Sequence, residues 1–146
     1  MHPERGTVLA FDFGAKRVGV AVGDAALKLA HPLTVIHGEG SARRFQAIAA
    51  LVREWCPVLL VVGTPVREDG TAHPMGERCR RFARRLAGRF RLPVVVVDER
   101  LTSWSAEEAL IRAGASPGKR RALLDAAAAQ TILESYFAEP HLAKKP

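Results

Sequence analysis

The chain has 146 residues, of which 48% are hydrophobic and 25% charged, and its formal net charge is +7. We expect a single domain over residues 1–146 with a short tail from about residue 139. The composition excludes a disordered or collagen-like chain. The longest strongly apolar run, 58–62, is too short to span a bilayer, so no membrane partner is expected. No secretory signal is readable and there are only two cysteines, which predicts a cytoplasmic protein.

The positive charge is concentrated in one segment. Residues 77–91 contain seven Arg and one Glu, which supplies +6 of the net charge of +7. Four of these arginines recur at helical spacing, namely Arg78, Arg81, Arg85 and Arg89. A solvated helix face and a row of charges along a nucleic-acid backbone both explain this pattern.

The hydrophobic pattern predicts an α/β protein. In chain order it indicates strands at 7–13, 17–22 and 32–36, a helix from the N-cap Ser41 to about Trp55, a strand at 58–62, a loop from Gly63 to about Pro74, a helix that buries Cys79, Phe82, Ala83, Leu86 and Phe90, a strand at 94–97, a helix opened by the capping box Ser105/Glu108, and a helix from about 119 to 138. A meander followed by alternating helices and strands predicts a mixed five-stranded sheet with helices on both faces. This order resembles the ribonuclease H-like fold.

Acidic residues stand in apolar surroundings at three places. Asp12 interrupts the first strand, Asp98 and Glu99 end a strand of four valines, and Asp125 lies on an alanine-rich helix face. An unpaired carboxylate there costs several kcal/mol, so each acid must lie at an opening, pair with a cation or bind a metal. For Asp125 a buried salt bridge and the wall of a site are both open interpretations.

Together these acids predict a site for divalent cations. Carboxylates within a few ångströms of one another need a compensating cation. Mg²⁺ prefers oxygen ligands and keeps positions open for water and phosphate. Two such ions would activate a water and stabilise the leaving oxygen in phosphodiester hydrolysis.

Four ordered segments resemble the motifs of the YqgF/RuvX family, the Holliday-junction-resolvase-like proteins also known as pre-16S rRNA nucleases. They are DFGAKRVGVAVGD at 12–24, VGTP at 62–65, DERLT at 98–102 and DAAAAQTIL at 125–133, and the resemblance covers about residues 6–137. It implies a ribonuclease H-like nuclease of the cytoplasm that depends on Mg²⁺ or Mn²⁺ and processes the 5′ end of pre-16S rRNA.

Carried over by position, the resemblance assigns the catalytic and metal-binding roles to Asp12, Glu99 and Asp125. Asp98 is the alternative to Glu99, because adjacent strand residues point to opposite faces. We prefer Glu99, whose longer side chain can turn into the cleft beyond the strand end. The residues expected to contact nucleic acid are Lys16, Arg17, Arg81, Arg85, Arg100 and Thr102.

RNA is the favoured substrate, and three alternatives remain. A junction-resolving DNA endonuclease would act as a homodimer with paired sites, whereas an RNA nuclease is a monomer or a homodimer. A non-catalytic nucleic-acid-binding protein remains open, because the strand that ends in Gly63-Thr64-Pro65 lacks the acid found in related junction resolvases. An actin-like ATPase needs two lobes, which 146 residues do not provide.

Overall fold

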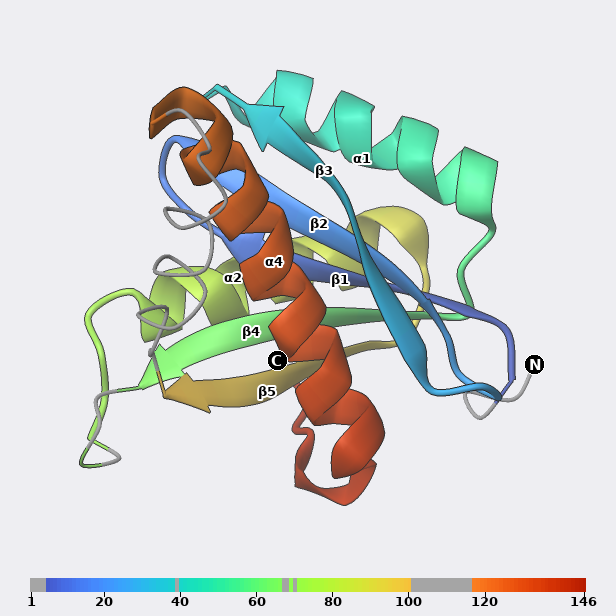
Figure 1. Cartoon of the computed structure of the whole chain (residues 1–146). Coiled ribbons are helices and arrows are strands. Elements are labelled where there is room, and N and C mark those ends of the chain that lie inside the picture. Colours follow the sequence, from blue (N-terminus) through green and yellow to red (C-terminus); the bar gives the residue numbers. More distant parts are fainter. Residues whose placement is uncertain (1–4, 39, 67–68, 70, 101–116) are drawn as a thin grey trace.

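The computed structural model describes residues 5–38, 40–66, 69, 71–100 and 117–146 (Figure 1). Its elements are β1 (Thr7–Phe13), β2 (Arg17–Asp24), β3 (Leu29–His37), α1 (Ser41–Trp55), β4 (Leu59–Val66), α2 (Gly76–Phe90), β5 (Val94–Arg100), α4 (Pro117–Ala138) and the short 3₁₀ helix η1 (Pro140–Leu142). None of the described helices is long and apolar enough to cross a bilayer.

The strands form one mixed sheet of five strands in the order β3-β2-β1-β4-β5. β1 and β2 pair antiparallel, as do β2 and β3, whereas β4 lies parallel to both β1 and β5. The carboxyl ends of β1, β4 and β5 therefore meet at one edge of the sheet. This edge is where ligand sites form in such sheets, and the predicted mixed sheet is confirmed.

Each face of the sheet carries its own hydrophobic core. Leu9 and Phe11 of β1 face α1 and α2, whereas Val8 and Ala10 face α4, which crosses the near side of the sheet in Figure 1. Helices thus cover both faces, as predicted. Because strand side chains alternate between faces, Asp12 falls on the α4 face together with Val8 and Ala10.

Two sequence predictions are wrong in detail. The loop expected from Gly63 is strand, because β4 continues to Val66 and pairs with β5 up to Arg100. Gly63 serves close packing instead of a turn, since a Cβ there would lie 2.4 Å from Ile132 Cδ1 of α4. Ser41 is not the N-cap of α1; Gly40 takes that position and its carbonyl accepts the hydrogen bond from the Arg44 N–H.

Candidate functional site

A pocket of about 290 Å³ opens where the β1–β2 hairpin meets α4. Its lining residues are Asp12, Gly14, Ala15, Lys16, Arg17 and Asp125. Two of the three predicted metal-binding acids and two predicted phosphate contacts therefore share one pocket. The hairpin supplies the cationic wall, and the end of β1 and the helix α4 supply the acids.

Asp125 reaches Asp12 because α4 approaches β2 unusually closely. Gly19 pairs with Asp12 across the β1–β2 ladder. A Cβ on Gly19 would lie 2.0 Å from the Asp125 carbonyl oxygen, so only glycine fits under the helix at this point. Ala126 and Ala129 are buried in the same contact. The alanine-rich face that surrounds Asp125 is therefore the surface by which α4 docks on the sheet.

Asp125 is ion-paired across the pocket. Arg17 Nε lies 2.7 Å from Asp125 Oδ2, and both side chains are part-buried, with 31% and 23% of their surfaces exposed. Both interpretations of Asp125 thus hold, because the salt bridge forms one wall of an open pocket. The exposed Lys16 lies beside this pair without neutralising it.

The Asp12 carboxylate is the most perturbed acid of the site. Burial raises the pKa of Asp12 from 3.8 to about 6, and the negative charges of Asp125 and Glu99 raise it further in that direction. No hydrogen bond or ion pair to the described residues holds this carboxylate. Its raised pKa shows that the three acids sense one another electrostatically.

Glu99 lies on the same face of the sheet as Asp12. Val97, two residues earlier in β5, packs in the core beneath α4, so strand alternation places Glu99 on that side as well. Burial raises the pKa of Glu99, the hydrogen bond from Ser135 of α4 lowers it, and the charge of Asp98 raises it. Its Oε1 is buried and accepts no hydrogen bond, which is the state of an oxygen that lacks its ligand.

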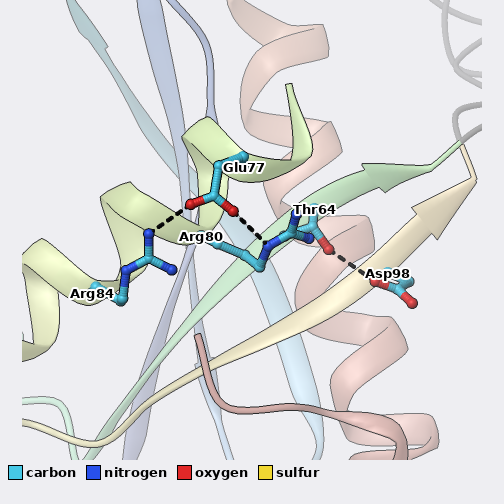
Figure 2. Close-up of polar contacts among 5 residues, drawn as sticks. All are labelled: Thr64, Glu77, Arg80, Arg84 and Asp98. Atoms are coloured by element: carbon cyan, nitrogen blue, oxygen red, sulfur yellow. Dashed lines mark hydrogen bonds and ion pairs between the residues drawn. The ribbon is translucent and has the colours of Figure 1, made fainter. Parts of the chain in front are cut away.

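Asp98 belongs to a different set of contacts (Figure 2). Thr64 Oγ1 of β4 donates to Asp98 Oδ1 at 3.0 Å, and Lys144 Nζ lies 3.2 Å from Asp98 Oδ2. The backbone of Lys144 also bonds with Val96 at the outer edge of β5. Asp98 is thereby bound by its neighbours, whereas Glu99 keeps a free oxygen on the pocket side of the sheet.

The other predicted contacts are not gathered at the pocket. Arg81 and Arg85 lie on α2, which packs against the opposite face of the sheet. Arg100 ends β5 opposite Val66, and Thr102 lies outside the described residues, as do Trp104 and the helix predicted from Ser105.

Ser135 is a functional residue that the sequence prediction missed. Its spacing from Asp125 was the available signal, because 125, 128, 132 and 135 follow one helical face. The residue that the sequence prediction could not have paired is Arg17, which is 108 positions from Asp125.

The acids do not form a closed metal cage. Within the part of the chain that the structure describes, no three His, Cys, Asp or Glu side chains are grouped to hold a cation. The donor chemistry nevertheless suits one, because a cation would relieve the mutual repulsion at Asp12 and occupy the buried Oε1 of Glu99.

The mixed sheet, the helices on its two faces and the acids at the carboxyl ends of β1 and β5 define a ribonuclease H-like protein. Two solved structures share this fold. A Thermus thermophilus RuvC in complex with a Holliday junction substrate matches with a TM-score of 0.54 at 18% identity, over 95% of this chain and 98% of that one. The fowlpox virus Holliday junction resolvase matches with a TM-score of 0.52 at 14% identity, over 93% and 99%.

The chain belongs to the RuvX family, whose model is described as Holliday junction resolvase and matches residues 6–139. A Methylobacillus flagellatus relative is 53% identical over 133 residues, which is 91% of each chain. One from Dechloromonas aromatica is 54% identical over 136 residues, 93% of each. Both carry the name "Putative pre-16S rRNA nuclease". The predicted family and fold are confirmed, and the protein is a nuclease, a hydrolase that acts on phosphodiester bonds.

Proposed function

We propose that this protein hydrolyses phosphodiester bonds in the precursor of 16S rRNA, in the cytoplasm, at the pocket between the β1–β2 hairpin and α4. The observation that carries the proposal is the raised pKa of Asp12, which places its charge beside those of Asp125 and Glu99 on the wall of an open pocket. The names of the relatives support RNA as the substrate.

We propose that Asp12, Glu99 and Asp125 hold Mg²⁺ or Mn²⁺. Such an ion, when bound, supplies an activated water and stabilises the negative charge that develops on the phosphate. Asp12 offers a carboxylate that nothing else binds, and Glu99 offers its free Oε1. Asp125 joins this set when its carboxylate is released from Arg17, which lies 2.7 Å away.

Arg17 and Lys16 bind and orient the scissile phosphate. Both belong to the hairpin wall of the pocket, opposite the acids. A guanidinium that leaves Asp125 finds an equivalent acceptor in a phosphate oxygen, because both groups accept charge-assisted hydrogen bonds. The exchange keeps Arg17 neutralised throughout, so substrate binding leaves no buried charge unpaired. Arg100 and Thr102 remain predicted contacts beside Glu99.

Cleavage by paired variants tests the assignment. We expect Asp12→Asn and Glu99→Gln to lower metal-dependent cleavage of a pre-16S-like RNA at least a hundredfold. Asp98→Asn is the matched control, since it removes one charge from the neighbouring residue on the other face of β5 and should retain most of the activity. Equal losses in the two β5 variants would contradict the choice of Glu99.

A four-way DNA junction is the second substrate to assay. The description of the family model favours it as the alternative. Cleavage of the junction but not of RNA would make this protein a resolvase, and symmetric cuts would require a homodimer with paired sites. Tight binding of RNA without turnover, at any divalent cation, would instead identify a non-catalytic nucleic-acid-binding protein.

A further inference from the structure

The helix α2 presents arginines in two different states. Arg84 Nη2 and Arg80 Nε lie 2.7 and 3.3 Å from the Glu77 carboxylate, so this pair is largely neutralised (Figure 2). The remaining exposed arginines of the helix have no carboxylate partner among the described residues. They form what we call the α2 arginine row, which comprises Arg78, Arg81, Arg85 and Arg89.

Aromatic rings hold three members of this row in place. The guanidinium carbon atoms of Arg85 and Arg89 lie 4.7 and 4.8 Å from the centroid of the Phe45 ring of α1. That of Arg78 lies 5.8 Å from the Phe13 ring at the end of β1. A guanidinium stacked on a ring keeps its N–H donors directed outward and loses less side-chain entropy when it binds an anion. The row is therefore ordered before any ligand arrives.

The row leads away from the catalytic pocket on the other side of the sheet. α2 begins next to the edge that carries the acids, since a Cβ on Gly76 would lie 3.8 Å from the Pro65 carbonyl oxygen, and Pro65 pairs with Glu99. The helix ends at the opposite edge, where β5 begins. From Arg78 to Arg89 it rises by about 17 Å. A chain that leaves the pocket over this edge meets Arg78 first and Arg89 last.

We infer that the α2 arginine row binds the phosphate backbone of the RNA that flanks the cleaved bond. This inference rests on the proposed function for the identity of the polyanion. Regularly spaced guanidiniums without counter-charge fit repeated phosphates, and the scarcity of stacking platforms for bases indicates contacts without sequence preference. The substrate is therefore a structured RNA whose flank extends well beyond the pocket.

Two double variants that remove the same charge from the same helix test this inference. Arg81→Gln/Arg85→Gln disrupts the row, whereas Arg80→Gln/Arg84→Gln removes the arginines that Glu77 already neutralises. Binding of a structured RNA with a long flank is measured by fluorescence anisotropy over a series of salt concentrations, without divalent cations. Retained thermal midpoints would show that both variants fold.

We expect the row variant to lose roughly tenfold in affinity and to reduce the slope of log K against log salt by about two, one for each phosphate contact. The control variant should keep the slope of the wild type. Arg85→Lys/Arg89→Lys should keep the slope but bind more weakly, because an ammonium stacks poorly on Phe45. Equal slopes for the row and control variants would overturn the inference.

Cleavage assays separate this inference from the proposed function. For the row variant, the loss should appear in KM for the long RNA and be much smaller for an RNA that fills only the pocket. A wild-type protein that cleaves no RNA would refute the proposed function, while the salt slopes would still decide on the row. Intact cleavage with unchanged slopes would refute the row alone.

Discussion

Replacing Asp12 by Asn should stabilise the folded protein while it removes the activity. The pKa of Asp12 is raised from 3.8 to about 6, first by burial and then by the charges of Asp125 and Glu99. At about 1.4 kcal/mol per pKa unit, keeping this group ionised in the folded state costs about 3 kcal/mol. Asn has the shape of the protonated acid and carries no charge, so the variant should recover most of that free energy at neutral pH.

The sign of the pH dependence follows from proton linkage. Because the pKa is higher in the folded protein than in the unfolded chain, the folded state binds more protons between pH 3.8 and about 6. The stability of the wild type therefore falls as pH rises through this window. The gain from Asp12→Asn should be about 3 kcal/mol at pH 7.5 and shrink to about 1 kcal/mol at pH 4.5.

Urea unfolding at these two pH values measures the gain directly. Glu134→Gln is the matched control, because it removes one charge from an exposed position of α4 and should change stability by less than about 0.5 kcal/mol. Added Mg²⁺ should stabilise the wild type more than Asp12→Asn, since an ion bound to the folded state shifts the equilibrium. An Asp12→Asn protein that is no more stable than the wild type, or a gain that does not change with pH, would refute the electrostatic coupling of the acids.

Three further substitutions test the packing and the contacts around the site by urea or thermal unfolding. Gly19→Ala places a Cβ 2.0 Å from the Asp125 carbonyl oxygen, so we expect a loss of roughly 3 kcal/mol or more together with the activity; a neutral result would show that α4 can shift freely. Gly88→Ala meets nothing within 4 Å on the exposed side of α2 and should gain about 0.5–1 kcal/mol. Lys144→Met breaks a pair with Asp98 whose side chains are 68% and 47% exposed, so a loss above about 1 kcal/mol would be unexpected.

The strand pattern allowed the catalytic face to be predicted in part. Alternation along β1 separates Asp12 from its neighbours Phe11 and Phe13, and the same alternation separates Asp98 from Glu99. The preference for Glu99 relied on side-chain length, whereas the structure supplies a different reason. Thr64 and Lys144 engage Asp98, and both are distant in sequence, by 34 and 46 positions.

The side of the sheet on which α2 packs could not be read from its own sequence. Its arginine spacing predicts an exposed row, which the structure confirms, but a helix pattern contains no information on which face it covers. That face follows from the strand order, because right-handed crossovers from β1 to β4 and from β4 to β5 place α1 and α2 on the same side. Once β1, β4 and β5 are known to be parallel neighbours, the separation of the arginine row from the acids follows.

This separation preserves the chemistry of the acids. Two unit charges about 10 Å apart interact by less than about 2 kcal/mol even at an effective dielectric constant of 20, whereas at 4 Å the interaction is about 4 kcal/mol. Arginines across the sheet can therefore attract a polyanion without neutralising the Asp12 and Glu99 carboxylates. Arg17 is on the same face as these acids and does pair with Asp125. Moving a row arginine to that face would add a second competing cation, so charge on α2 and charge in the β1–β2 hairpin should have opposite effects on the affinity of the acids for metal.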